Sequence, residues 1–221
     1  MKIVLVVAAH ADDEALGCAG TMLKHVASGD QVHVLFMTDG VSARQVGENT
    51  ASERKSNAEQ AGKVIGVKSM DNFDFPDNKM DTVALLDVTQ GVEHKIAEIQ
   101  PSIIYTHHIG DLNIDHQVTH KAVMTACRPQ PGFCVKEIYA FEVLSSTEWQ
   151  TPGYKPFFVN KYVDITNYIE LKKKAIQAYH GELKCEPHTR SGKNIIRLNI
   201  IRGNSVGIEY TEAFSIIRII S

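Results

Sequence analysis

The sequence predicts an α/β fold with a mostly parallel central sheet. Short apolar segments alternate along the chain with longer segments whose apolar residues recur at helical spacing. The first short segment, at residues 2–9, is a continuous β-branched and aliphatic run, which is typical of a strand buried on both faces of a parallel sheet. This alternation implies right-handed crossovers between parallel strands, with helices packed against the sheet.

The expected elements follow this alternation from the amino terminus. Strands are expected at residues 2–9, 31–37, 71–75, 102–106 and 138–143. Helices are expected at residues 12–28, 51–65, 85–99, 115–127 and 168–179, several of them followed by glycine or proline as a stop signal. A final stretch at 209–218 completes the fold. The segments 129–132 and 152–156 are expected to be loops rather than linkers, so residues 1–221 are expected to form a single domain.

Composition and charge argue against several classes of protein. The chain has 221 residues, 43% of them hydrophobic, which is enough for one core of ordinary size. Its formal net charge is −3 and its basic residues are scattered, so no nucleic-acid partner is expected. No apolar run approaches the roughly 20 residues of a membrane-spanning helix. The first apolar run leads into an acidic cluster and not a signal cleavage site, so a cytoplasmic protein is expected, with its four cysteines as free thiols.

Two clusters of histidine and acidic residues follow predicted strands. The first, at residues 10–14, reads His-Ala-Asp-Asp-Glu, and the second covers residues 107–116. In open α/β sheets the binding crevice lies beyond the carboxyl ends of the strands, where both clusters fall. Acidic residues can also be present simply because they stabilise a helix N-terminus, and for the first cluster alone that explanation is equally good.

The histidines favour a metal site over simple helix capping, because capping requires no imidazole. His10 and Asp13 bracket a tight turn and can converge on one cation, and His116 is the natural third ligand. Two imidazoles and one carboxylate leave an open coordination position, which is the composition of a catalytic zinc site. His107 and His108 lie at the mouth of the same crevice, where they could orient a ligand or contact substrate.

These clusters resemble the motifs of the PIG-L or LmbE-like deacetylases. The first family motif, A-H-P-D-D-E, corresponds to residues 9–14, and the second, which ends in D-H, corresponds to residues 115–116. Further landmarks of the family correspond to Arg54 and to residues 75–77, 145–149, 187–191 and 210–214. The resemblance implies a Rossmann-like three-layer fold with helices on both faces of the sheet. It also implies a zinc-dependent hydrolase that removes the acetyl group from an acetylated amino sugar such as an N-acetylglucosamine conjugate.

The resemblance also assigns expected roles to individual residues. It places Zn²⁺ on His10, Asp13 and His116, with Asp12 as the general base that deprotonates the attacking water. Asp115 is expected to orient a neighbouring catalytic group or, nearly as well, to cap its helix. The resemblance implies that Arg54 binds substrate, and His107, His108, Glu142 and Ser145 are expected to bind it because they could line the pocket. Tyr105, Glu148 and Trp149 are further candidates for the pocket wall, although Trp149 could equally serve packing.

Three positions depart from the family pattern. Ala11 replaces the common proline, and Asn57 stands where many members have glutamate. Asn113 occupies the position of a histidine that in the family stabilises the transition state or transfers a proton. An amide can donate a hydrogen bond to an oxyanion but cannot transfer a proton. We therefore hypothesise that His188, or one of His107 and His108, supplies the missing imidazole.

Alternative functions remain open at this stage. The enzyme could be an amidase acting on another N-acyl conjugate. It could also be a non-haem iron enzyme that holds Fe²⁺ with the same two histidines and one aspartate, although such sites usually lie on β-sandwich scaffolds. A nucleotide-binding module without catalysis is suggested only by the Rossmann-like order of elements and by the glycines at 17 and 20, which fall inside a predicted helix. The expected partner is a small acetylated amino sugar, and the chain could form a homo-oligomer.

Overall fold

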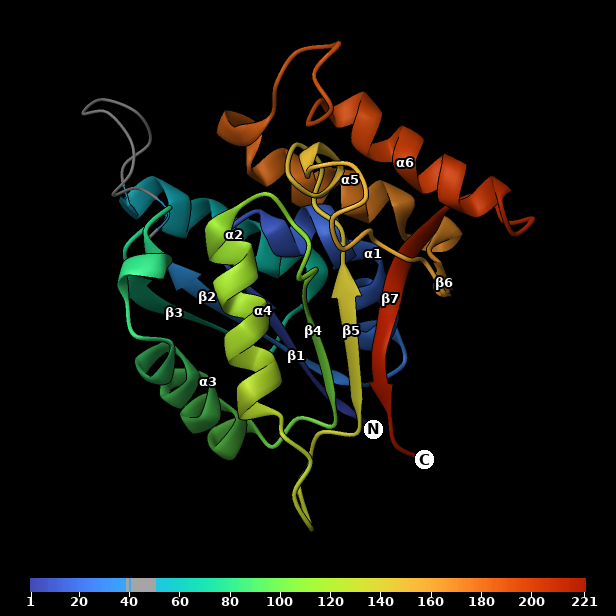
Figure 1. Cartoon of the computed structure of the whole chain (residues 1–221). Helices are drawn as coiled ribbons and strands as arrows, with labels where there is room; N and C mark the ends of the chain where they lie inside the picture. Colours follow the sequence, from blue (N-terminus) through green and yellow to red (C-terminus); the bar gives the residue numbers. More distant parts are fainter. Residues whose placement is uncertain (39, 41–50) are drawn as a thin grey trace.

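A seven-stranded sheet forms the centre of the computed structural model, which describes residues 1–38, 40 and 51–221 (Figure 1). Its strand order is β3-β2-β1-β4-β5-β7-β6. The strands are β1 (Ile3–Ala8), β2 (Gln31–Thr38), β3 (Ser69–Phe75), β4 (Ile103–His107), β5 (Glu137–Phe141), β6 (Lys161–Asp164) and β7 (Thr211–Ile219). The first five are parallel to one another, whereas β7 is antiparallel to both β5 and β6.

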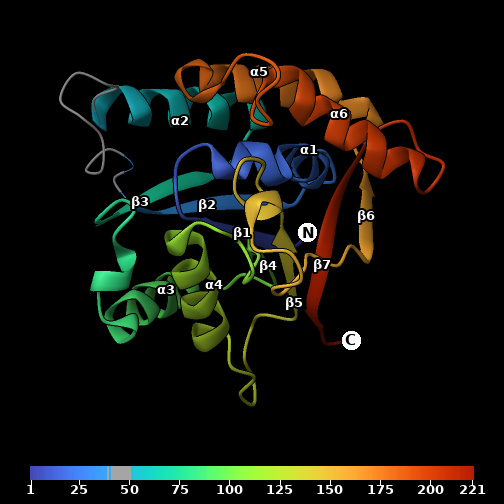
Figure 2. The same cartoon turned by 45° about the horizontal axis from the view of Figure 1, so that its top comes forward.

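Helices cover both faces of this sheet, as Figure 2 shows. One face carries α1 (Asp13–Ala27), α2 (Ala51–Ile65), α5 (Ile169–Ala178) and α6 (Gly192–Asn204). The other carries α3 (Leu85–Ile99) and α4 (Ile114–Ala126). Short 3₁₀ turns are η1 (Met80–Thr82), η2 (Thr147–Trp149), η3 (Thr166–Tyr168) and η4 (His180–Glu182). The arrangement confirms the predicted three-layer α/β fold.

Strand β1 shows why the central strands are apolar throughout. Val4 and Val6 lie in the core under α1, whereas Leu5 and Val7 lie in the core under α3 and α4. All four side chains are fully buried. Each face of the strand therefore needs apolar residues, and the continuous run in the sequence reflects burial on both sides.

The structure contains the strands and helices expected from the sequence and adds one strand and one helix. The final stretch is strand β7, which places an antiparallel pair at one edge of the sheet. Strand β6 and helix α6 were not expected. All four cysteines are free thiols, as predicted. Among the described residues, no helix is long and apolar enough to cross a membrane.

Helix α1 is broken at Cys18, whose backbone leaves the helical conformation (φ −150°, ψ 20°). The side chain of Glu212, from β7, reaches into this break and accepts the N–H groups of Gly20 (2.8 Å) and Thr21 (2.7 Å). Lys172, from α5, donates to the same carboxylate at 2.6 Å. A buried ion pair thus replaces hydrogen bonds that the break removes from the helix.

The glycines of α1 are explained by close packing. A Cβ atom at Gly17 would lie 2.5 Å from the Phe141 ring, and one at Gly20 would lie 2.7 Å from Ile165. These positions need glycine because the helix approaches its neighbours too closely for any side chain. The pattern that suggested a nucleotide-binding module therefore has a packing role.

Candidate active site

The two histidine and acid clusters meet because their strands are neighbours in the sheet. Strand β1 pairs with β4 in parallel, so the loops that follow them leave the same edge side by side. A pocket of about 400 Å³ opens at this edge, a volume within the range of small-molecule sites. Its wall is formed by His10, Asp12, Gly40, Arg54, Asp77, Asn78, Leu112, Asn113, His116, Ser145, Ser146, Trp149, Glu182 and Arg190.

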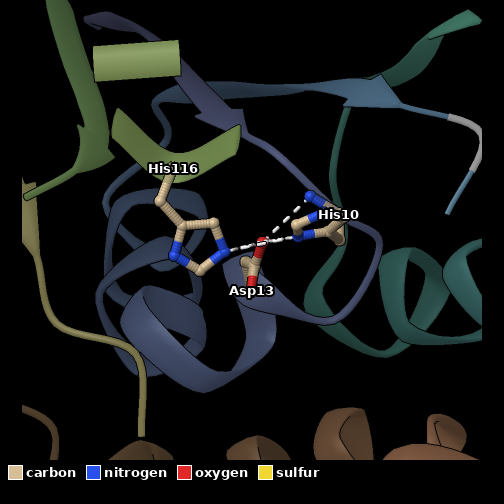
Figure 3. Close-up of side chains that lie close together, drawn as sticks. All are labelled: His10, Asp13 and His116. Atoms are coloured by element: carbon tan, nitrogen blue, oxygen red, sulfur yellow. Dashed lines mark hydrogen bonds and ion pairs between the residues drawn. The ribbon is translucent and has the colours of Figure 1, made fainter. Parts of the chain in front are cut away.

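Three side chains, His10, Asp13 and His116, lie close together (Figure 3), and the two histidines belong to the pocket wall. Asp13 Oδ2 lies 3.2 Å from His10 Nδ1 and 3.3 Å from His116 Nε2, and the two nitrogens are 3.3 Å apart. Ligand atoms that bind zinc at about 2.0–2.1 Å in a tetrahedron lie about 3.3 Å from one another. The three atoms therefore have the spacing of one face of a tetrahedral metal site.

Carboxylates face the remaining nitrogen of each histidine. His10 Nε2 lies 3.1 Å from Asp115 Oδ2 and 3.1 Å from Asp77 Oδ1. His116 Nδ1 lies 3.1 Å from Asp111 Oδ1. Metal-binding histidines almost always direct their second nitrogen at such an acceptor, which fixes the ring and its tautomer. Both rings are therefore oriented to present their other nitrogen to a cation.

A second group of possible ligands shares His10 but fits a cation less well. It consists of His10, Asp77 and Asp115. Both oxygens of Asp115 already accept backbone N–H groups, from Asn78 at 2.6 Å and from Met80 at 3.0 Å. Asp115 is thus engaged in holding the loop after β3 and in orienting His10. The cluster of His10, Asp13 and His116 is the better metal site.

The charges of the cluster also favour a bound cation. Burial opposes ionisation of Asp13, but His116 and His107 outweigh it and hold its pKa well below the usual value. Burial opposes protonation of His116, but Asp13 and Asp111 outweigh it and raise its pKa to about 9. In His10 the surrounding carboxylates likewise outweigh burial and raise the pKa. The carboxylates therefore stabilise positive charge in the cluster, and a divalent ion can supply that charge.

Asp12 has a strained backbone and a carboxylate that lines the pocket. Its φ of 140° lies in a region that residues with a side chain rarely adopt. Glu14 holds this conformation, because its carboxyl accepts the Asp12 N–H at 3.0 Å and the Tyr179 hydroxyl at 2.6 Å. Burial raises the pKa of Asp12, and Arg190, at 3.1 Å, partly offsets that shift.

Arg54 lines the pocket from α2 and is almost fully buried. Its guanidinium donates to the carbonyl oxygen of Ala11 at 2.9 Å, forms an ion pair with Glu182, and lies 3.9 Å from Asp12. Ser145 also lines the pocket, with a backbone φ of 66°. Both residues were expected to bind substrate, and both have side chains placed where a ligand could reach them.

The other residues expected to bind substrate lie outside the pocket wall. Glu142 forms a two-point ion pair with Arg202, at 2.9 and 2.8 Å. His108 Nε2 lies 2.7 Å from the Lys155 carbonyl oxygen. His107 is fully buried behind the metal site, where its Nε2 accepts the Ala9 N–H at 2.8 Å and its ring stacks on His116.

Asn113 lies in the pocket wall, whereas His188, one of the histidines expected to replace the family imidazole, lies outside it. Asn113 lines the pocket and caps helix α4, since its Oδ1 accepts the Asp115 N–H at 2.8 Å while its Nδ2 donates to Asn78 Oδ1 at 3.1 Å. His188 lies outside the wall, where its Nδ1 accepts the Arg190 N–H at 3.0 Å. Among the described residues, the pocket wall contains no imidazole besides the two candidate metal ligands.

Sequence reasoning assigned no role to four polar residues that the structure places at the site. Asp111 and Asp77 face the histidines, and Arg190 and Glu182 line the pocket. Three of these carried a signal, because they fall in the second cluster, in the F-P-D element and in the segment 187–191. Glu182 carried none, since it lies in an unremarkable stretch after α5.

Comparison with known proteins defines the family. The family model described as "PIG-L: GlcNAc-PI de-N-acetylase" matches residues 5–127, and the chain belongs to this family. Similar proteins include a diacetylchitobiose deacetylase from Thermococcus kodakarensis, 27% identical over 82% of this chain and 70% of the relative. A probable N-acetyl-alpha-D-glucosaminyl L-malate deacetylase 2 from Bacillus anthracis is 23% identical over 81% of this chain and 80% of the relative.

The solved structures show that the fold is shared along the whole chain. The crystal structure of 4-carboxy-2-hydroxymuconate hydratase from Pseudomonas putida KT2440 superposes with a TM-score of 0.80 and 24% sequence identity. The match covers 100% of this chain and 99% of the hydratase chain.

Proposed function

We propose that this protein is a zinc-dependent N-deacetylase that releases acetate from an acetylated amino sugar. The observation that carries this proposal is the spacing of 3.2–3.3 Å among the three ligand atoms of His10, Asp13 and His116, beside the pocket carboxylate of Asp12. Family membership supports it, as do the substrates named for the two relatives described above. Both of those relatives are named for the deacetylation of N-acetylated sugars.

Each residue of the site would have a separate role in amide hydrolysis. A zinc ion held by the two histidines and Asp13 would supply Lewis acidity, which lowers the pKa of water and polarises the acetyl carbonyl. Asp12 accepts the proton of the attacking water and returns it to the departing amine nitrogen as the C–N bond breaks, and Arg190 orients this carboxylate. The amide of Asn113 lines the pocket, and its second N–H, the one not given to Asn78 Oδ1, would donate a hydrogen bond to the developing oxyanion.

A screen for acetate release tests this proposal. Metal-replete protein is incubated with N-acetylglucosamine, N,N′-diacetylchitobiose and N-acetylglucosaminyl malate, and acetate is measured. The variant Asp12→Asn should retain its zinc and lose on the order of a hundredfold or more in kcat. Loss of zinc from this variant would make Asp12 a metal ligand. Absence of acetate from every acetylated sugar would refute the deacetylase.

Zinc is favoured over Fe²⁺ because the fold is a parallel α/β sheet and the proposed reaction needs no electron transfer. Elemental analysis of protein purified in air, combined with an oxygen-consumption assay, separates the two metals. Stoichiometric iron with substrate-dependent oxygen uptake would establish the non-haem iron alternative.

Hydration of an unsaturated acid is a second candidate, and the pocket wall provides a specific reason for it. Hydration of a double bond can use the same residues, because the proton that Asp12 takes from water is returned to carbon instead of to nitrogen. Arg54 and Arg190 line the pocket, and guanidinium groups can bind substrate carboxylates. Loss of the ultraviolet absorbance of 4-carboxy-2-hydroxymuconate, without acetate release from any acetylated sugar, would favour the hydratase.

A further inference from the structure

Two large apolar side chains stand exposed at the rim of the pocket. Trp149 is 51% exposed and Leu112 is 49% exposed, although both belong to the pocket wall. A half-exposed indole at the mouth of a polar pocket is a surface that a ligand can cover. The rim pair, Trp149 and Leu112, is therefore a candidate contact for the part of the substrate that extends out of the pocket.

The rim pair is firmly attached to the metal centre. The carbonyl oxygen of Ser146 accepts the N–H of Trp149 at 3.2 Å and the N–H of Leu112 at 3.4 Å. The hydroxyl of Ser146 donates to Asp111, the carboxylate that faces His116 Nδ1. A ligand bound at the rim would therefore lie at a fixed position relative to the reacting atoms.

His188 supports the indole from outside the pocket. Its ring meets the Trp149 ring edge to face, with centroids 5.5 Å apart and an angle of 74°. The imidazole is itself held, because its Nδ1 accepts the Arg190 N–H. Contact with His188 covers part of the indole, and about half of Trp149 stays open to a ligand.

The distribution of charge indicates what kind of ligand this rim accepts. The two arginines in the described part of the wall are both engaged by acids at the Asp12 end, Arg54 by Glu182 and Arg190 by Asp12. Three other wall residues lie close to the rim pair in the chain: Asn113, Ser145 and Ser146. Their side chains are a neutral amide and two hydroxyls. A neutral ring fits these surroundings better than a carboxylate or phosphate, which would need a cation.

We infer that the rim pair is a platform for an uncharged second ring joined to the acetylated amino sugar. This inference rests on the proposed deacetylase function and specifies its substrate class. The acetamido group would point to the metal centre, and the C–H face of a second pyranose ring would pack on the indole of Trp149. A disaccharide should therefore bind more tightly than the acetylated monosaccharide.

Fluorescence offers a direct binding test, because Trp149 is the only tryptophan in the chain. The metal-loaded Asp12→Asn variant is titrated with N-acetylglucosamine, N,N′-diacetylchitobiose and N-acetylglucosaminyl malate. The disaccharide should shift the emission of Trp149 and bind about tenfold more tightly than the monosaccharide, the scale of one aromatic stacking contact. A disaccharide that binds by calorimetry without changing the emission, or that binds no better than the monosaccharide or the malate conjugate, would overturn the inference.

Kinetics of rim variants give an independent test. Trp149→Ala should lower the ratio of kcat/KM for disaccharide over monosaccharide about tenfold, mainly through KM, whereas Trp149→Phe should retain most of the ratio. Leu86→Ala serves as a matched control, since this leucine is 65% exposed and lies outside the pocket wall. An unchanged ratio in Trp149→Ala with normal acetate release would refute the platform and leave the deacetylase intact. Disaccharide binding at Trp149 with no acetate release would refute the deacetylase and leave the platform.

Discussion

Replacing Lys172 by methionine should destabilise the protein by about 3–5 kcal/mol, the usual loss when one partner of a buried ion pair is removed. Lys172 is fully buried, as is the carboxylate of Glu212 that it contacts at 2.6 Å. The ammonium also donates to the Leu16 carbonyl oxygen at 3.1 Å, beside the break in α1. Methionine has nearly the same length, so the substitution removes the charge while largely preserving the packing.

The magnitude can be measured by urea unfolding. With an m value of about 3 kcal/mol/M, a loss of about 4 kcal/mol lowers the midpoint by more than 1 M. The double variant Lys172→Met with Glu212→Gln should recover most of this loss, because no buried charge is left unpaired. It should not recover all of it, since glutamine offers one oxygen where the carboxylate accepts both Gly20 and Thr21.

A neighbouring lysine supplies the control for this experiment. Lys173 lies on the same helix, its side chain is 42% exposed, and it pairs with Glu170 on the surface. Lys173→Met should change stability by less than about 0.5 kcal/mol. If Lys172→Met proved as stable as Lys173→Met, the buried ion pair would contribute little to the stability of the broken helix, and the prediction would be wrong.

Three further predictions concern the active site. Tyr179→Phe leaves the buried Glu14 without one hydrogen bond and should lower the free energy of unfolding, measured in urea, by about 1–3 kcal/mol. It should also reduce kcat, because Glu14 holds the backbone of Asp12. Unchanged stability and kcat would contradict this prediction. Arg190→Met removes the cation that lowers the pKa of Asp12, so the acid limb of the pH–rate profile should move to higher pH, whereas Arg190→Lys should shift it less. Neighbouring carboxylates outweigh burial and raise the pKa of His116 to about 9 without metal, so zinc binding at pH 7 should release a proton and weaken as the pH falls. Calorimetry in two buffers of different ionisation enthalpy measures that release, and identical heats would exclude it.

The central sheet could be predicted from the sequence because strands buried on both faces need apolar residues at almost every position. Strand β1 is a continuous aliphatic run and β2 ends in a buried apolar one, and helix α1 between them is followed by Gly29 as a stop signal. The parallel order then places the loops after β1 and β4 at one edge of the sheet, which brings the histidines together. The position of the site thus follows from topology more than from any single motif.

The carboxyl-terminal part was harder to predict because its elements are short or half exposed. Strand β6 has only four residues, with alternating burial, and is too brief for a periodicity signal. Helix α6 carried a usable signal that was overlooked, since Ser191 caps it by accepting the Asn194 N–H at 3.2 Å. Among its Ile and Leu residues only Ile195 is buried, so the helix lacks the clear buried stripe that marks the helices of the core.

The roles of the individual acids could not be assigned from sequence, because several aspartates of identical chemistry meet in one place. Hydrogen bonds from distant backbone groups separate their roles. Asp115 accepts the N–H groups of Asn78 and Met80, so its oxygens are committed and it serves to orient His10. Because Asp115 occupies Nε2 of that ring, Nδ1 is the nitrogen that faces Asp13 and His116. Which nitrogen of His10 is available to a cation is therefore decided by a loop after β3 that lies some 35 residues away from α4 in the chain, and no local motif can reveal it.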